Sequence, residues 1–202
     1  MGSSYLASPL LLIINTIFDL YILLVLVRFM LQWLRADFYN PVSQFIVRAT
    51  TPPLKILRRI IPGFGGQDIA ALVLALLIIL IKYAILIAMG TPVIELGNAL
   101  APIGSVSILG LVIIALAEII SMFINVFLFA ILISVILSWI NSGGYNPVIG
   151  LVQSLSQPVM RPIQKFIPPL GGLDLSPLFA LLGLNVVKML LLPPIVYFAT
   201  QL

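Results

Sequence analysis

The residues of this sequence most able to do chemistry stand inside long apolar stretches. They are Asp19, Arg28, Lys82, Glu118, Asn125 and Lys188. An unpaired charge in hydrocarbon costs about 3 kcal/mol or more, so each charge is expected to find a partner. Asp19 lies 14 residues before Trp33, and Lys82 lies 14 residues after Asp68. With a rise of about 1.5 Å per residue, antiparallel helices bring both to one depth, about 21 Å from a shared end. We expect Asp19 and Lys82 to pair.

The same spacing occurs a second time, where Asn125 and Lys188 fall at matched depth. One interpretation is an ion or proton path, or a polar docking site. The alternative is a structural ion pair, or lysines whose stems reach to the outer headgroups. The sequence leaves both open. Glu118 has no charged counterpart, so we expect it near the outer end of its long apolar stretch.

Several classes of chemistry are disfavoured by what the sequence lacks. It has no histidine and no cysteine, which removes the usual general base, the thiolate nucleophile and the common ligands of metals and haem. Its serines and threonines therefore have no histidine base. Neither the phosphate-binding loop nor the dinucleotide-binding pattern is present. We predict that the protein is not an enzyme and holds no metal or cofactor.

The composition indicates a membrane protein. Hydrophobic residues make up 62% of the 202 positions and charged residues only 8%, against about 25% charged in an ordinary soluble domain. A bilayer core of about 30 Å needs about 20 apolar residues in a helix. Four stretches are long enough: 10–34, 69–89, 108–140 and 177–198. We therefore expect an all-α fold with four transmembrane helices.

The loops between these stretches predict the orientation. Loops 35–68 and 141–174 carry basic residues, whereas the loop 90–107 carries only Glu95 as a charged residue. The positive-inside rule then places loops 35–68 and 141–174 in the cytoplasm and both termini outside. An even number of spans agrees, because it requires both termini on one side.

The chain is an internal duplication with an offset of 106 residues. Between 31–68 and 137–174, 12 of 38 positions are identical. The shared motif residues are Trp33, Asn40, Pro41, Pro52, Pro62, Gly65, Gly66 and Asp68 in the first copy and Trp139, Asn146, Pro147, Pro158, Pro168, Gly171, Gly172 and Asp174 in the second. We divide the chain into repeat one, 1–100, and repeat two, 101–202, each with two spans. Equal topology predicts a pseudo-two-fold axis along the membrane normal.

Each basic loop is expected to hold two short amphipathic helices in the headgroup region. Asn-Pro begins the first of them, as an N-cap followed by proline, and Pro52-Pro53 or Pro158 ends it. The second has a basic face that suits anionic lipid or a partner protein. Its basic residues are Lys55, Arg58 and Arg59 in repeat one and Arg161 and Lys165 in repeat two. The Gly-Gly pairs then allow a tight turn, and Asp68 or Asp174 caps the next span.

The tryptophan, the Asn-Pro seven residues later and the basic segment ending in Pro, Gly-Gly and Asp resemble the YggT (YlmG) family. Repeat two matches the family's ending closely, with Leu173 to Pro177, whereas repeat one departs from it after Gly66. Arg28 fits an arginine often found before the tryptophan, but repeat two has Ser134 there. The resemblance implies a bacterial inner (plasma) membrane protein linked to osmotic-stress tolerance, cell division or, in plastids, haem attachment to a cytochrome.

Two functions are consistent with these features. The first is a membrane scaffold or assembly factor that binds other membrane proteins or anionic lipid, in envelope, division or membrane-complex biogenesis. The second is an oligomeric channel or transporter for ions or small solutes, since four spans hardly enclose a pore alone. We expect anionic lipids and membrane proteins as partners, with a homo-oligomer also open, and no nucleic acid, because the basic surface is small.

Overall fold

A computed structural model describes residues 2–63, 66–140, 146–167 and 174–202, and its side chains from residue 9 onward. Four of the predicted motif residues, Gly65, Pro168, Gly171 and Gly172, lie outside the described residues. Four helices are long and apolar enough to cross a membrane, as the sequence predicted. They are α1 (Gly2–Trp33), α3 (Ile69–Ala88), α4 (Ile108–Ile140) and α6 (Ser176–Thr200).

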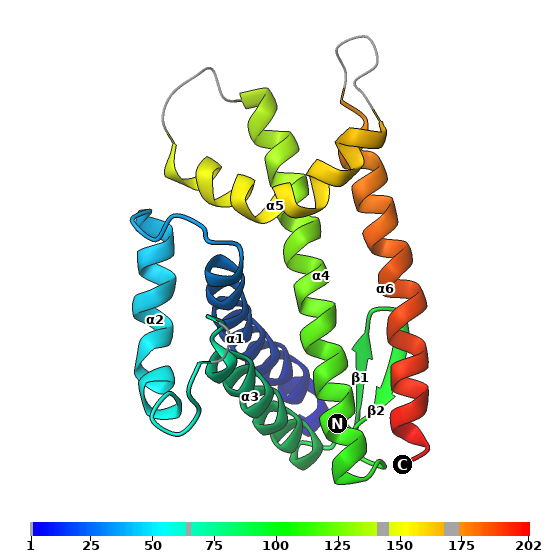
Figure 1. Ribbon diagram of the computed structural model, residues 1–202. Helices are drawn as coiled ribbons and strands as arrows, with labels where there is room; N and C mark the ends of the chain where they lie inside the picture. The colour runs from blue at the N-terminus through cyan, green and yellow to red at the C-terminus, as the bar shows by residue number, and fades with distance from the viewer. Residues whose placement is uncertain (1, 64–65, 141–145, 168–173) are drawn as a thin grey trace.

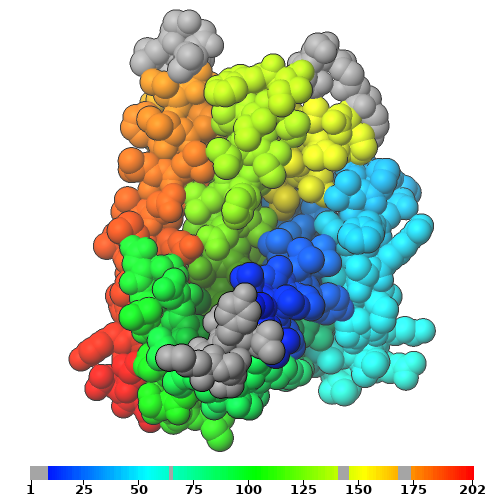
Figure 2. Space-filling model, turned by 180° about the vertical axis from the view of Figure 1, so that it is seen from behind, coloured from blue at the N-terminus to red at the C-terminus, as the bar shows by residue number. Residues whose placement is uncertain are grey.

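Two of these four helices lie in repeat one and two lie in repeat two. Figure 1 shows the first residues of α1 and the last residues of α6 at one end of the bundle. We call this the terminal end, and the opposite end, where α4 finishes and α6 begins, the loop end. In the same view α1 and α3 run obliquely to α4 and α6 (Figure 1). From behind, α1 lies at the surface between the green 90–105 region and α2 (Figure 2).

One helix fills each basic loop, which corrects the prediction of two. These are α2 (Pro41–Leu57) and α5 (Pro147–Phe166). Asn40 and Asn146 are their N-caps, as predicted, and each side chain accepts a hydrogen bond from the backbone N–H two residues later at 2.9 Å. α2 continues through Pro52 and Pro53, and α5 through Pro158.

The continuation through proline has an identifiable cause in α2. Proline lacks an N–H and leaves the carbonyl four residues earlier without its helical donor. For Pro53 that carbonyl belongs to Ala49, which accepts a hydrogen bond from the Tyr21 hydroxyl of α1 at 3.4 Å. A neighbouring helix thus replaces the missing donor, as is usual in membrane proteins. The helix α6 also runs through two prolines, Pro193 and Pro194.

A β-hairpin between the repeats is a feature that the sequence analysis missed. Its strands are β1 (Val93–Leu96) and β2 (Ala99–Pro102), paired antiparallel. Gly97, in the turn, has φ +63°, a conformation that favours glycine. The hairpin packs against α6 and α4, and the predicted boundary between the repeats falls within β2.

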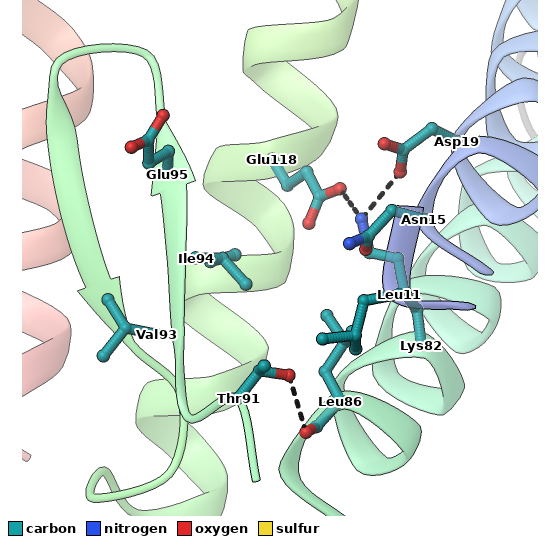
Figure 3. Close-up of a pocket in the computed structure, with 10 residues that line it drawn as sticks. All are labelled: Leu11, Asn15, Asp19, Lys82, Leu86, Thr91, Val93, Ile94, Glu95 and Glu118. Atoms are coloured by element: carbon teal, nitrogen blue, oxygen red, sulfur yellow. Dashed lines mark hydrogen bonds and ion pairs between the residues drawn. The ribbon is translucent and has the colours of Figure 1, made fainter. Parts of the chain in front are cut away.

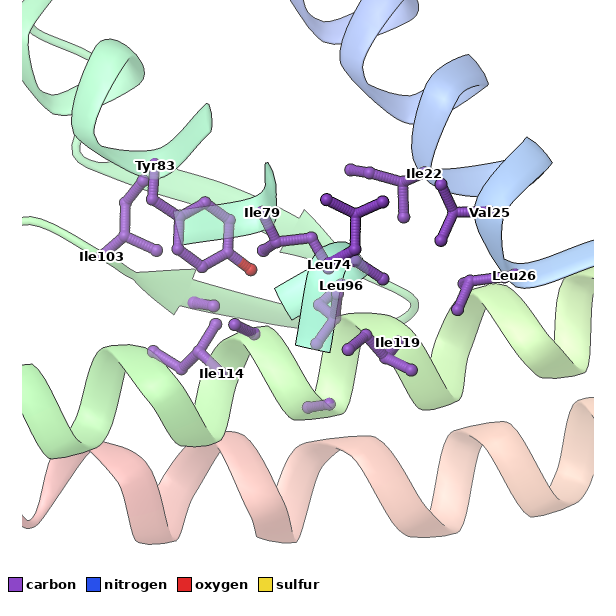
Figure 4. Close-up of a cluster of buried hydrophobic side chains, with 14 of the residues drawn as sticks. Ile22, Val25, Leu26, Leu74, Ile79, Tyr83, Leu96, Ile103, Ile114 and Ile119 are labelled. Carbon is purple, nitrogen blue, oxygen red and sulfur yellow. The ribbon is translucent and has the colours of Figure 1, made fainter. Parts of the chain in front are cut away.

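The main apolar core joins both repeats through the hairpin. Its buried side chains come from α1, α3, the hairpin region, α4 and α6, and Figure 4 shows part of this cluster. A second cluster connects α1 and α2 to α4 and α5, with Met30, Leu31 and Leu155 among its members. In lipid, such packing stabilises by close contact, without the gain from leaving water, so polar ties between helices add specificity.

Candidate functional site: an intramembrane charge network

Lys82 of α3 is the centre of a network of charged side chains between three spans. Its ammonium group lies 2.8 Å from Asp19 Oδ1 of α1 and also binds Glu118 Oε1 of α4. Lys82 is only 4% exposed, so it does not reach out to a headgroup. The structure thus brings together the pair expected from the sequence and adds a second carboxylate. One side chain of α3 thereby connects α1 to α4.

Glu118 has two partners on α3 that the sequence analysis did not predict. It is 5% exposed, and its second oxygen, Oε2, accepts a hydrogen bond from the Tyr83 hydroxyl at 2.5 Å. Tyr83 follows Lys82 on α3, so α3 contacts Glu118 with two consecutive side chains. The repeat comparison missed this role because the position equivalent to Glu118 in repeat one, Leu12, is apolar.

A cavity of about 370 Å³ opens beside this network, toward the hairpin. Figure 3 shows Asp19 and Lys82 on one side, the hairpin with Glu95 on the other, and Glu118 between them. Asn15 and Thr91 add further polar groups to the lining. Asp19 keeps 46% of its side chain exposed, whereas Lys82 and Glu118 are buried at the floor. The cavity therefore gives access to the network but does not pass through it.

The equivalent pair of repeat two is simpler. Lys188 Nζ of α6 donates a hydrogen bond to Asn125 Oδ1 of α4 at 2.7 Å. This is the depth match expected from the sequence, with an amide in place of a carboxylate. Asn125 and Asp19 also line a second cavity, of about 430 Å³, between α4 and α1. Its remaining lining is almost entirely apolar, with Leu20, Leu23 and Phe129 among the residues.

Arg28 joins α1 to α2. Its guanidinium donates to the Val47 carbonyl at 3.0 Å and to the hydroxyls of Thr50 and Thr51 at 2.8 and 3.0 Å. The side chain is 6% exposed, so the whole group is enclosed between the two helices. All three contacts come from one nitrogen, Nη1, and all three acceptors lie on one face of α2. Ser134 occupies the matching position of repeat two.

The two loop aspartates have different roles, which corrects part of the capping prediction. Asp68 makes no capping hydrogen bond and instead forms a salt bridge with Arg58, so this arginine is partly tied to the protein. Asp174 Oδ1 accepts from the backbone N–H of Ser176 at 2.8 Å. Hydrogen bonds from Ser176, and a further one from Gln164, hold the pKa of Asp174 below its ordinary value.

The remaining predicted residues lie mainly at the surface. Trp33 and Trp139, near the ends of α1 and α4, are 51% and 83% exposed, as interfacial anchors are expected to be. The loop basic residues are exposed as well: Lys55, Arg58, Arg59, Arg161 and Lys165. Asn40 also donates to the Pro147 carbonyl, which joins the starts of α2 and α5 and therefore the two repeats.

These features define a multi-pass membrane protein of two tandem two-span repeats, each with a helix in its loop. The family comparison agrees in detail. The CCB3/YggT family model matches residues 7–89 and again 113–195. Both limits differ by 106 residues (113 − 7 and 195 − 89), so the predicted register of the duplication is confirmed. The chain belongs to the CCB3/YggT family.

Two bacterial relatives match most of the chain, and a plant relative matches a shorter part of it. A Pseudomonas aeruginosa protein described as uncharacterized is 49% identical over 180 residues, 89% of this chain and 86% of that protein. Escherichia coli K12 YggT, also described as uncharacterized, is 36% identical over 179 residues, 88% of this chain and 86% of that protein. An Arabidopsis thaliana chloroplastic YlmG homolog is 36% identical over 63 residues, 31% of this chain and 25% of that protein. No solved structure matches the chain.

Proposed function

We propose that this protein is a non-enzymatic membrane scaffold or assembly factor, which holds other membrane proteins or anionic lipid at its basic loops. The observation that carries the proposal is the use of the charged side chains within the spans. Lys82, Arg28 and Lys188 each bind a side chain or carbonyl of a neighbouring helix. These side chains therefore brace the helices, while the exposed basic groups lie on α2 and α5 and on the turn after α2.

The proposed location is the bacterial inner membrane, with both termini outside and loops 35–68 and 141–174 in the cytoplasm. The basic residues of these loops support this orientation, because positive charge is retained on the cytoplasmic side. Exposed arginines and lysines near a membrane surface attract anionic headgroups by about 1 kcal/mol each. The basic loops would then be held against the inner leaflet, where they meet partners.

Affinity purification from native membranes in mild detergent tests the proposal. The wild type is compared with a variant carrying Lys55→Gln and Arg59→Gln, which leaves the Arg58–Asp68 salt bridge intact. We expect stoichiometric membrane proteins with the wild type, and weaker recovery of them or of anionic lipid with the variant. The absence of any stable partner, together with intact membrane complexes in a deletion strain, would contradict the scaffold.

The second candidate, an oligomeric channel or transporter for ions or small solutes, is favoured by one observation. The cavity of about 370 Å³ ends at Asp19, Lys82 and Glu118, with Glu95 on its far wall. Polar groups that converge within a membrane are typical of ion paths. Flux through liposomes containing the purified protein would test this. The double variant Lys82→Met with Lys188→Met should abolish a flux that uses these groups, and an unchanged flux would exclude that path.

A further inference from the structure

Two charges within the spans are unbalanced and can be reached from outside the chain. Lys82 contacts both Asp19 and Glu118, so two carboxylates share one ammonium group and leave a surplus negative charge. Lys188 forms no ion pair with any of the six acidic residues of the chain, all of which lie in the described segments. Asp19 is 46% exposed and Lys188 is half-buried, whereas Arg28 is enclosed against α2. Because an unbalanced charge is costly in hydrocarbon, Asp19 and Lys188 each favour a partner of opposite sign.

Both charges lie beside α4 at one level of the bundle. Asp19 lines the cavity of about 430 Å³ between α1 and α4, and Asn125 of α4 lines the same cavity. Lys188 Nζ reaches Asn125 Oδ1 from α6 at 2.7 Å. The helix α1 thus brings a carboxylate, and α6 an ammonium group, to the same part of α4. Within one chain Asp19 and Lys188 do not form an ion pair with each other.

The face that carries these charges includes the two least buried spans. In α1 and in α6 only 17% of the 18-residue apolar stretch is buried, against 44% in α3 and 33% in α4. Seen from behind, α4 lies between α1 and α6 (Figure 2). A two-fold axis along the membrane normal, in front of this face, brings α4 of two copies together and places α1 of each copy against α6 of the other. Both copies then have the same orientation in the membrane, so Asp19 and Lys188 of different copies meet at equal depth.

We propose that two copies of this chain form a two-fold dimer through this face, in which Asp19 of each copy pairs with Lys188 of the other. Charge complementarity argues for a second copy as the occupant, because the two surplus charges are opposite in sign and each copy supplies both. Asp19 binds Lys82 through Oδ1, and the second oxygen of the carboxylate can accept from a further donor. The contact uses α1, α4 and α6 and none of the basic loop residues. It therefore goes beyond the proposed scaffold function and does not depend on it.

The first test measures energy transfer between two differently labelled copies at increasing dilution in liposomes. Lys188→Met and Asp19→Asn each remove one member of both pairs, so each variant should associate with itself about tenfold more weakly than the wild type. A mixture of K188M with D19N keeps one complete pair, because K188M contributes Asp19 and D19N contributes Lys188. Mixed dimers should therefore form about threefold more tightly than dimers of either variant alone. Unchanged self-association of K188M, or mixed dimers no tighter than those of the single variants, would overturn the pairing.

A second test locates the face without changing either charge, which covers the case of a poorly folded K188M or D19N. The chain has no cysteine, so an introduced cysteine reports only its own contact. Phe129→Cys, on α4 in the lining of the cavity, should be joined into dimers by a short bifunctional maleimide in native membranes. The matched control is Ile81→Cys, which is also exposed but lies on α3, on the side seen in Figure 1. Cross-linking of F129C that does not exceed that of I81C would overturn the face.

A further variant separates the contact between copies from the bond within one copy. Asn125→Ala removes the hydrogen bond that Lys188 makes inside the chain but keeps both charges, so self-association should persist. The outcome is also separable from that of the scaffold function. A particle with a single copy of the chain and other membrane proteins would overturn the dimer and leave the scaffold standing. A dimer without other proteins would support the pairing and count against the scaffold.

Discussion

The replacement Lys82→Met tests the idea that the charge network braces the helices. Methionine keeps the apolar stem but removes the ammonium group that binds Asp19 and Glu118. Asp19 is 46% exposed and can be solvated through the cavity, whereas Glu118 is 7% exposed as a side chain and is left with Tyr83 alone. Removing one partner of a buried ion pair costs about 3–5 kcal/mol. Because one of the two carboxylates can reach water, we expect about 3 kcal/mol.

The measurement is the free energy of unfolding in mixed micelles with increasing SDS. Lys188→Met is the matched control, because Lys188 occupies the equivalent position and makes one hydrogen bond, to Asn125. Such a bond between membrane helices contributes about 0.6 kcal/mol. In the double variant Lys82→Met with Glu118→Gln, the uncompensated buried carboxylate is gone, so stability should partly return. A loss under about 0.5 kcal/mol for K82M, or equal losses for K82M and K188M, would refute the reasoning.

Three further predictions use the same unfolding measurement. Arg28→Met should cost about 3 kcal/mol, because the acceptors on α2 lose their buried donor, and Arg28→Lys should cost less; equal stability of R28M and the wild type would contradict this. Asp174→Asn should be less stable than the wild type at neutral pH. Hydrogen bonds from Ser176 lower the pKa of the folded Asp174, so its stabilisation is present above the unfolded pKa of about 3.9 and is lost as the pH falls through the folded pKa. The two proteins should therefore converge as the pH falls below the folded pKa, and a constant difference would argue against the hydrogen bond from Ser176. Gly97→Ala should cost about 1–2 kcal/mol, because its φ is +63° and the added Cβ would lie 3.0 Å from a Leu192 methyl; an unchanged stability would show that the hairpin does not pack there.

The four spans could be predicted because they depend on composition. The duplication could be predicted because its register is found by comparing the two halves of the sequence. Long apolar stretches allow few structures in a bilayer. The motif identities between 31–68 and 137–174 fix one offset, and the family match has that same offset. The pairing of Asp19 with Lys82 could also be predicted, because the rise per residue of a helix converts sequence spacing directly into depth.

The partners of Glu118 were not predicted, because its contacts depend on how the repeats pack against each other. Comparison of the repeats pairs it with an apolar leucine and gives no sign of a partner. The packing of α3 against α4 places Lys82 and Tyr83 beside it. One available signal was its isolation, since Glu118 is the sole charged residue of its long apolar stretch. A single intramembrane charge requires a partner from another helix.

Two local features were missed for different reasons. The prolines of α2 were interpreted as helix ends, but a tertiary hydrogen bond from Tyr21 replaces a donor that Pro53 cannot supply. This depends on α1 and cannot be seen in the loop sequence. The hairpin did have a local signal, since Gly97-Asn98 separates two short segments that form β1 and β2. A glycine followed by asparagine is typical of a two-residue hairpin turn.

We propose a scaffold whose charged side chains hold its own helices together. The most direct test is the mass of the particle released from native membranes, with its protein content identified. For a scaffold we expect a particle that contains this chain and other membrane proteins in fixed stoichiometry. A homo-oligomer without other proteins, whose liposome flux is lost with Lys82→Met, would contradict it and favour permeation.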